Sequence, residues 1–336
     1  MMKSISGVLT LLLAVLGFAV TQAAPVSAAA KPLPAICTTS GPISARSAPA
    51  KISLRSCPIQ GRLLVLKLSN GKLGPGLHIP GPGQGTGGSE LTTHGEYDLS
   101  AVNVRGWVTI RWSVPAKPAH AATPAATDPA CSENAYNWEG PFWANTGTPT
   151  DAWYYNESTA SRAGLTVSAT ESDIRQANTN LTRGINNCGW SEGAFGVRGA
   201  FQGNTSKYAN INSASACTSN FPDGQNTVSW GSFDSNHSGA LAYTCYNWHT
   251  DANGYPVMTE ADTYLGSNRN IVDTFPANCS NRYDLQSVMT HEWGHAYGMA
   301  HESSGGDEVM YPYESPCHLR RHLGGGDYSG MAGLYP

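Results

Sequence analysis

The chain has 336 residues, which exceeds one average domain and suits two, and its apolar share of 40% excludes wholesale disorder. Only 13% of the residues are charged and the net charge is −4, which argues against a nucleic-acid-binding protein. The charge is divided unevenly, because residues 1–130 carry +7 and residues 131–336 carry −11. Two parts of opposite sign can attract each other or meet different partners.

The first thirty residues have the features of a secretory signal peptide. Lys3 precedes an apolar run over residues 8–20, and small residues follow between positions 23 and 30. The run is shorter than the ~20 residues that a membrane-spanning helix needs. We therefore expect residues 1–30 to be removed and the mature chain to be secreted, extracellular and without a membrane span.

Eight cysteines follow the signal peptide. Their number is even and the expected compartment is oxidising, which predicts disulfides. No C-x-x-C pair occurs, which weakens a structural cysteine–zinc site. Two cysteines precede residue 130 and six follow it, so each part can pair internally. They are Cys37, Cys57, Cys131, Cys188, Cys217, Cys245, Cys279 and Cys317.

Residues 31–114 indicate a small all-β N-terminal module. The runs at residues 62–68 and 104–112 are β-branched and partly alternating, which is typical of strands. The stretch between them, GPGLHIPGPGQGTGG at residues 74–88, is rich in turn-forming residues. Residues 115–130 are rich in Pro, Ala and Thr without an apolar period, which predicts a linker.

Residues 131–336 indicate an α/β domain. A capping-box pattern at Ser168 and Glu171 opens an apolar period typical of a helix, which residues 187–189 would end. A second helix begins near Tyr283, and Asp327 is expected to cap the last helix. The apolar positions of the first helix are Ile174, Ala177, Leu181 and Ile185. Strand-like runs lie at residues 227–233, 241–246 and 257–264.

Residues 291–301 read HEWGHAYGMAH and predict one catalytic zinc ion. On a helix, His291 and His295 project from one face, and two imidazoles so placed can bind one Zn²⁺ at ~2.0–2.1 Å. Gly298 has no Cβ, so it can take a positive φ, end the helix and reverse the chain. The turn brings back His301 as a third ligand and leaves the fourth position open for water.

Glu292 follows the first predicted ligand directly, so it faces the cleft beside the metal rather than binding it. Zinc lowers the pKa of its bound water toward ~7, and a neighbouring carboxylate can take that proton. The resulting hydroxide would attack a carbonyl polarised by the same ion, and Glu292 would pass the proton to the leaving amine. We therefore expect a metalloendopeptidase, a hydrolase with Glu292 as general base and acid.

The extended motif resembles the signature of the metzincin metallopeptidases, H-E-x-x-H-x-x-G-x-x-H followed by a Met-turn. VMYP at residues 309–312 is similar to that turn, which implies that Met310 is an apolar floor beneath the zinc. Among the metzincins the chain resembles the matrixins, since GDYSGMAGLY at residues 326–335 is also similar to a matrixin segment. Stretches that resemble secreted matrixin-like peptidases of actinobacteria lie at residues 187–189, 227–231 and 241–245.

The resemblance implies an α/β (α+β) catalytic domain over residues 131–336, with a mixed twisted sheet and an active-site helix. It implies that the strand at residues 241–246 is the sheet edge above the cleft, where a protein or peptide substrate adds as an antiparallel strand. The implied substrate-binding residues are Leu241, Ala242, Tyr243, Tyr311, Pro312 and Tyr313.

Three features depart from the animal matrixins. Only His237 lies in the stretch that would hold a second, structural zinc, so we do not predict that site. Loops rich in Asp, Asn and Gly leave Ca²⁺ open as a further ion, although no EF-hand pattern occurs. The matrixin cysteine-switch sequence is missing: LRSCP at residues 54–58 is a loose echo, and a disulfide between Cys37 and Cys57 is favoured.

Two interpretations of the N-terminal module stay open. As a propeptide, the basic module would dock on the acidic catalytic domain, block the cleft and be cut in the linker. As a retained module, its positive surface would hold the enzyme near an anionic cell wall. Two alternative activities also remain, a zinc amidase acting on cell-wall peptide crosslinks and a non-catalytic binding module that retains the metzincin fold. We assume a monomer.

Overall fold

The computed structural model describes residues 33–68, 71–114, 129–144, 150–193, 195–302 and 306–336. Within it, Pro34–Pro336 form one compact unit. The predicted signal peptide and most of the predicted linker, residues 115–128, lie outside the described residues. Among the helices described, none has the length and apolar character needed to cross a membrane.

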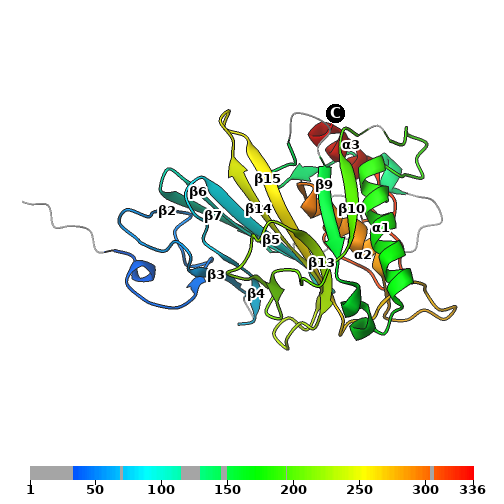
Figure 1. Ribbon diagram of the computed structural model, residues 1–336, viewed down its shortest axis with the longest axis horizontal. Coiled ribbons are helices and arrows are strands. Elements are labelled where there is room, and N and C mark those ends of the chain that lie inside the picture. Colours follow the sequence, from blue (N-terminus) through cyan, green and yellow to red (C-terminus); the bar gives the residue numbers. More distant parts are fainter. Residues whose placement is uncertain (1–32, 69–70, 115–128, 145–149, 194, 303–305) are drawn as a thin grey trace, which may run out of the picture. The chain divides into compact units, whose positions relative to one another are not determined.

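A nine-stranded mixed sheet forms the centre of this unit (Figure 1). Its strand order is β10-β9-β13-β15-β14-β5-β6-β7-β2. The first four strands run parallel, and from β15 onward each strand is antiparallel to the next. The expected mixed α/β architecture agrees with this sheet. In the same order, the strands span Arg198–Asn204, Thr150–Tyr155, Asn226–Gly231, Pro256–Gly266, Ala240–Thr250, Gln84–Thr92, Gly95–Val104, Trp107–Ser113 and Lys51–Ser53.

The strands β5, β6, β7 and β2, all from the N-terminal module, extend this sheet (Figure 1). β5 pairs antiparallel with β14, so β14 is an interior strand. The expectation that residues 241–246 form the sheet edge is therefore wrong in this conformation. The physical reason is that β5 pairs with the backbone N–H and C=O groups that an edge strand would leave unpaired.

The glycine-rich stretch at residues 74–88, expected to form turns, keeps a turn at residues 82–83 but otherwise contributes mainly to β4 and β5. Close packing explains this difference. A Cβ on Gly85 would lie 2.0 Å from the Trp248 ring, and a Cβ on Gly87 would lie 2.3 Å from the Tyr246 ring. Glycine therefore marks a close approach of two strands here, as it does at other strand positions where a side chain would not fit.

The run at residues 104–112, expected to be one strand, is divided by a hairpin turn. β6 ends at Val104 and β7 begins at Trp107. Arg105 and Gly106 between them have φ values of 52° and 78°. Positive φ at both central residues is typical of a two-residue type I′ hairpin.

A second, five-stranded sheet joins the N-terminal module to the later part of the chain. Its order is β1-β3-β4-β12-β11, and the first three strands precede residue 114. The core beside it contains Leu64 and Leu77 from the module together with Tyr243 and Tyr264 from the central sheet. The two parts of the chain therefore share one apolar core. The five strands span Ile43–Ser44, Leu63–Lys67, Leu73–His78, Ala216–Cys217 and Ile211–Asn212.

All eight cysteines are paired in disulfides, as predicted, and each pair lies within one of the two parts. The favoured disulfide between Cys37 and Cys57 is present. The others are Cys131–Cys188, Cys217–Cys245 and Cys279–Cys317.

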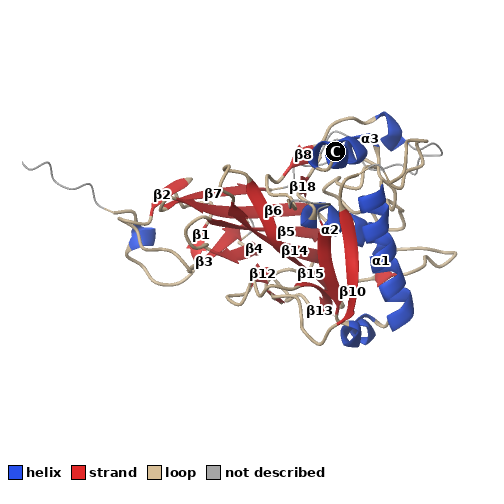
Figure 2. Cartoon of the chain, turned by 45° about the horizontal axis from the view of Figure 1, so that its top comes forward, coloured by secondary structure: helices blue, strands red, loops and turns tan. Residues whose placement is uncertain are grey.

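Two helices pack against each other beside the central sheet: α1 (Val167–Arg183) contacts β10 and α2 (Leu285–Ala296) contacts β14 (Figure 2). The Thr166 side chain caps α1 by accepting the N–H of Ala169 at 3.3 Å, so the expected capping box at Ser168 lies inside the helix. The buried side of α1 comprises Ile174, Ala177 and Leu181, as predicted, but the helix ends at Arg183 and is capped by Gly184, before Ile185 and the expected stop at residues 187–189.

The helix α2 is buried along its whole length. The Asp284 carboxylate caps it by accepting the N–H of Ser287 at 2.8 Å. The Trp293 indole N–H donates to the carbonyl of Ile174 on α1 at 3.2 Å, and its ring packs 5.0 Å from that of Trp153 on β9. These contacts fix α2 between α1 and the sheet.

The remaining elements are short. The helix α3 spans Gly325–Leu334 near the C-terminus. Two small ladders pair β8 (Asn137–Trp138) with β18 (Met299–Ala300) and β16 (Ile271–Val272) with β17 (Tyr283–Asp284). The 3-10 helices η1, η2 and η3 span Ala35–Cys37, Pro129–Ser132 and Glu157–Ala163.

Candidate metal centre

The three histidines of residues 291–301 converge where α2 ends. His291 and His295 lie one turn apart on α2. Gly298 follows with a φ of +90°, and a Cβ there would lie 2.2 Å from a backbone oxygen, so glycine is required at this turn. The chain then passes through β18 and brings His301 toward the other two rings, as the motif predicts.

The three imidazoles point their Nε2 atoms at one another. His295 Nε2 lies 3.2 Å from His291 Nε2 and 3.0 Å from His301 Nε2. On the opposite side of two rings, Nδ1–H of His291 donates to Val309 O at 2.6 Å and Nδ1–H of His295 donates to Met299 O at 3.1 Å. A carbonyl only accepts, so Nδ1 of each ring carries a proton, and in the neutral form that binds a metal Nε2 is left with a free lone pair.

Bare imidazole nitrogens at this separation repel each other unless a cation lies between them. Ligand atoms at ~2.0–2.1 Å around a tetrahedral zinc ion are about 3.3 Å apart, which is close to the observed spacing. Hydrogen bonds from the opposite ring nitrogens are the usual means by which a protein orients such ligands. The three histidines therefore fit one zinc ion.

A fourth side chain, Glu96 of β6, completes this cluster. Its Oε2 lies 2.5 Å from His291 Nε2 and 2.6 Å from His301 Nε2, and its Oε1 lies 2.9 Å from His295 Nε2. Burial alone would raise the pKa of Glu96, but the charges of the histidines, His301 foremost, bring it well below its usual value. The four side chains offer ligand atoms within 4.8 Å of one another.

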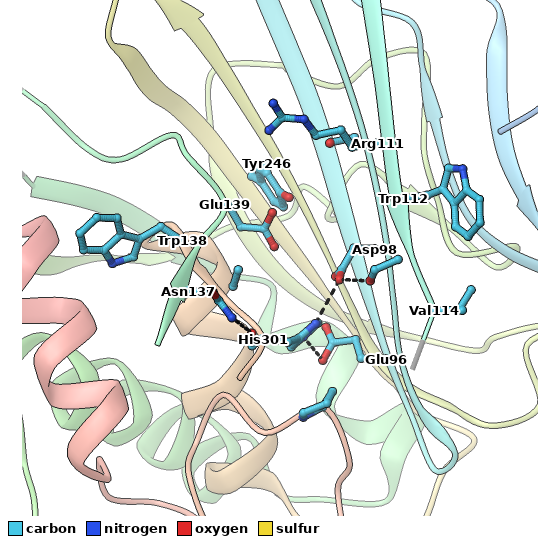
Figure 3. A pocket seen from close by; sticks show the side chains of 14 residues that line it. Glu96, Asp98, Arg111, Trp112, Val114, Asn137, Trp138, Glu139, Tyr246 and His301 are labelled. Atoms are coloured by element: carbon cyan, nitrogen blue, oxygen red, sulfur yellow. Dashed lines mark hydrogen bonds and ion pairs between the residues drawn. The ribbon is translucent and has the colours of Figure 1, made fainter. Parts of the chain in front are cut away.

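Asp98, two residues further along β6, contacts the third histidine (Figure 3). Its Oδ2 accepts Nδ1–H of His301 at 3.1 Å. The hydroxyls of Ser89 and Ser113 donate to the same carboxylate at 2.9 Å and 2.5 Å. The orienting partner of His301 thus belongs to the N-terminal module, whereas the partners of His291 and His295 belong to the later part of the chain.

Sequence reasoning missed Glu96 and Asp98. They are 195 and 203 residues from the histidines they contact, so no local motif contains them. One signal was present: the basic first part, residues 1–130, has four acidic residues, and three of them fall within residues 90–98. Acidic residues clustered in an otherwise basic module are candidates for specific buried contacts.

Glu292 lies beside the cluster and is fully buried. Its Oε2 accepts the Thr244 hydroxyl at 2.5 Å, and its Oε1 has no hydrogen-bond partner. Burial, followed by the negative charge of Glu96, raises the pKa of Glu292 to about 8. Thr244 lies on β14 and also contacts the hydroxyl of Thr263 at 3.0 Å. Its role in holding Glu292 was not predicted from the sequence.

Met310 is buried against α2. A Cβ on Gly294, the residue before His295, would lie 2.1 Å from Met310 Sδ. The Asp327 carboxylate accepts the backbone N–H of Met310 at 3.0 Å and of Val309 at 2.7 Å. Asp327 also accepts the N–H of Gly324, so it caps α3 from within the first turn and braces the Met310 turn at the same time.

The six expected substrate-binding residues occupy two places. Leu241, Ala242 and Tyr243 are buried in β14, and the hydroxyl of Tyr243 donates to Gly76 O at 3.0 Å on the sheet face away from α2. The Tyr311 ring packs 5.6 Å from that of Tyr313 in the turn after Met310. Pro312 lies between them in the chain and lines a cavity with His301.

That cavity, of about 490 Å³, opens beside the metal cluster (Figure 3). Its walls combine Glu96, Asp98 and Trp112 of the N-terminal module with Trp138 and Tyr246 of the later part. The N-terminal module therefore forms one side of the space next to His301.

Two further expectations concern other ions. The imidazole of His237 is engaged by Glu90, whose Oε1 lies 2.6 Å from Nδ1. Within the residues that the structure describes, Glu96 and the three histidines are the only group of three or more His, Cys, Asp or Glu side chains close enough to hold a metal ion. The calcium expectation therefore gains no support.

Comparison with known families identifies the later part of the chain. Residues 204–336 match the family model described as Matrixin. The resemblance drawn from residues 291–301 and 309–312 is confirmed by this match, and matrixins are zinc metallopeptidases. A comparison with curated proteins finds none that matches the chain.

Proposed function

We propose, on the premise that residues 204–336 form a matrixin-like metzincin domain, that the chain is a secreted zinc-dependent endopeptidase. The observation that supports it best is the set of three oriented Nε2 atoms beside the buried Glu292 carboxylate. Structural zinc sites are usually closed by four protein ligands, whereas three histidines with an adjacent carboxylate suit hydrolysis.

His291, His295 and His301 would hold the ion. When bound, zinc would polarise the scissile carbonyl and lower the pKa of the attacking water. Glu292 would take the proton of that water on Oε1, the carboxylate oxygen without a partner, while Thr244 holds Oε2. Glu292 would then donate that proton to the leaving amine.

Substrate would bind as an extended strand along β14. Leu241 and Ala242 would supply backbone hydrogen bonds, and the turn from Tyr311 to Tyr313 would form the pocket after the scissile bond. Strand addition takes its affinity from the backbone and its selectivity from such pockets. This arrangement requires a free edge on β14, which β5 occupies in the present conformation.

Secretion is supported by the four disulfides, which persist in oxidising compartments. We keep the division of the chain into a signal peptide over residues 1–30, a β-rich module over residues 31–114, a linker over residues 115–130 and a catalytic domain over residues 131–336. Mass spectrometry of the secreted protein tests it. A mature N-terminus between residues 120 and 131 supports removal of the module, and one between residues 24 and 31 in an active enzyme contradicts it.

The decisive experiment compares wild type with Glu292→Ala. Zinc content is measured by mass spectrometry, and hydrolysis of a quenched-fluorescent peptide library is measured before and after cleavage within residues 115–128. We expect about one zinc per chain in both proteins, and phenanthroline-sensitive activity in wild type alone. Casein and purified peptidoglycan as further substrates separate an endopeptidase from a cell-wall amidase.

Glu171→Ala is the matched control, because Glu171 lies on α1 and pairs with Arg175 at 3.1 Å instead of contacting the metal cluster. It should retain full activity. A zinc-loaded wild-type chain that cleaves no peptide after the module has been removed would refute the proposal.

A further inference from the structure

The hairpin of β5 and β6 occupies the cleft that the proposed peptidase would offer to substrate. β5 pairs antiparallel with β14 along almost the whole of both strands. Ser89 of β5 lies opposite Thr244, the residue that holds Glu292. β5 therefore runs beside β14 next to the general base, where a scissile peptide would have to lie.

The fit between β5 and β14 depends on missing side chains. A Cβ on Gly87 would lie 2.3 Å from the Tyr246 ring, and a Cβ on Gly88 would lie 1.9 Å from the Tyr243 hydroxyl. Both distances are far inside van der Waals contact, so the glycines allow β5 to approach β14 beneath these aromatic rings. A strand with ordinary side chains at these positions would have to lie differently.

The second strand of the hairpin carries the carboxylates. Glu96 and Asp98 are two residues apart on β6 and so project from the same face. Asp98 lies opposite Ser89, whose partner Thr244 contacts Glu292 of α2, so this is the face toward α2. Glu96 lies within 2.9 Å of all three Nε2 atoms, so its carboxylate is within reach of an ion that the three rings would hold.

Buried contacts on the opposite face anchor the same hairpin. Glu90 of β5 is 2% exposed and accepts the Ser215 hydroxyl at 2.8 Å, and its Oε1 lies 2.6 Å from His237 Nδ1. A buried carboxylate with two specific partners stabilises one position of a strand, because moving it would leave each partner unsatisfied. The hairpin is thus fixed to the later part of the chain on both faces.

No thiol is available for an inhibitory contact with the metal. All eight cysteines form disulfides, and Cys57 in the loose echo of the cysteine switch pairs with Cys37. A carboxylate is the remaining anionic zinc ligand that the module presents to the histidines.

We propose that the β5–β6 hairpin, residues 84–104, is a built-in inhibitor: β5 fills the place of the substrate strand on β14, and the Glu96 carboxylate is the fourth ligand of the zinc. The inference rests on the proposed endopeptidase function and on the propeptide interpretation of the module. Peptide substrate reaches Glu292 only after the hairpin has left both places.

The first test measures access to the metal with a small probe. The full chain is loaded with Co²⁺, whose absorption spectrum reports its ligands, and is titrated with acetohydroxamate. We expect Glu96→Ala to bind this probe at least about tenfold more tightly than wild type. Glu171→Ala, on α1 and away from both the hairpin and the metal cluster, is the control and should behave as wild type. Equal probe affinity in wild type and Glu96→Ala would overturn the ligand assignment.

The second test measures access to β14. Gly87→Val places a branched side chain against the Tyr246 ring and should displace β5 without changing any residue of the metal cluster. We expect the double variant Gly87→Val, Glu96→Ala to cleave a fluorogenic peptide at least about a hundredfold faster than Glu96→Ala alone. Equal rates in the two proteins would show that β5 does not block substrate.

If Gly87→Val fails to fold, hydrogen exchange can still show whether β5 must leave β14 before substrate binds. The amides of β14 are followed in the wild-type chain before and after cleavage within residues 115–128. We expect their protection to fall in the same samples in which peptidase activity appears. Activity with β14 fully protected would overturn the strand assignment.

Failure of the proposed function gives a different pattern from failure of the inhibitor. A chain that takes up no metal in any form, or an opened and metal-loaded chain that cleaves nothing, refutes the endopeptidase. A full-length wild-type chain that binds the probe and cleaves peptide refutes the inhibitor and leaves the endopeptidase intact.

Discussion

Gly294→Ala tests whether Met310 packs directly against the metal-bearing helix. A Cβ at this position would lie 2.1 Å from Met310 Sδ, and Met310 is 1% exposed, so its side chain has no solvent to move into. Overpacking a buried site lowers the free energy of unfolding by ~1–3 kcal/mol. Alanine in place of glycine in a helix interior raises it by ~1 kcal/mol. The clash outweighs the helix propensity, and we expect a net loss of up to about 2 kcal/mol.

The assay is urea unfolding of the full-length, disulfide-intact chain in EDTA, so that metal binding does not enter the comparison. Met310→Ala provides the matched background, because it removes the sulfur that the new Cβ would meet. There, Gly294→Ala should raise the free energy of unfolding by up to ~1 kcal/mol. The reversal of sign between the two backgrounds is the expected signature. Stabilisation by Gly294→Ala in the presence of Met310 would refute the packing of the Met310 turn on α2.

Three further outcomes are expected. Thr244→Val should lower kcat/KM of the processed enzyme by about tenfold or more, because a hydrogen bond to a charged group contributes ~1.5–3 kcal/mol; Thr244→Ser retains the hydroxyl, and equal loss in both variants would contradict this role. Burial raises the pKa of Asp151 to about 7, so the folded state holds a proton that the unfolded state releases near pH 4. The free energy of unfolding should therefore decrease as the pH rises from 4 to 7. Urea unfolding of Asp151→Asn should show a smaller decrease, and an equal decrease in both proteins would contradict this role of Asp151. Zinc at a hundredfold excess over its Kd should stabilise the chain by about 2.7 kcal/mol, and a Tm unchanged by chelation would show that the folded state has no zinc preference.

The part of the site that is local in sequence could be predicted, and the part built by distant strands could not. His291 and His295 follow from helical periodicity, and His301 follows from the turn at Gly298, because all three lie within eleven residues. Glu96 reaches the same point only through the pairing of β5 with β14, which no local period encodes.

The central sheet shows the same division. Apolar runs predict the later strands, whereas the glycines of β5 predict turns, because glycine usually marks a turn. What decided its conformation was the space left by Tyr246 and Trp248 on the neighbouring strand. Packing between the two strands overrides the turn preference of glycine, and this packing cannot be deduced from either strand alone.

The composition of β5 also influences how the strand would leave β14. Gly85, Gly87 and Gly88 contribute no side chains to the contact, so each is retained by its backbone hydrogen bonds and by the aromatic rings of β14. Glycine regains more conformational freedom on release than any other residue. Separation of β5 from β14 is therefore favoured by conformational entropy once the carboxylate contacts of Glu90 and Glu96 are broken. The glycines thus have two consequences. They let β5 pack closely on β14 while the contacts of Glu90 and Glu96 are intact, and they favour release of β5 once those contacts are lost.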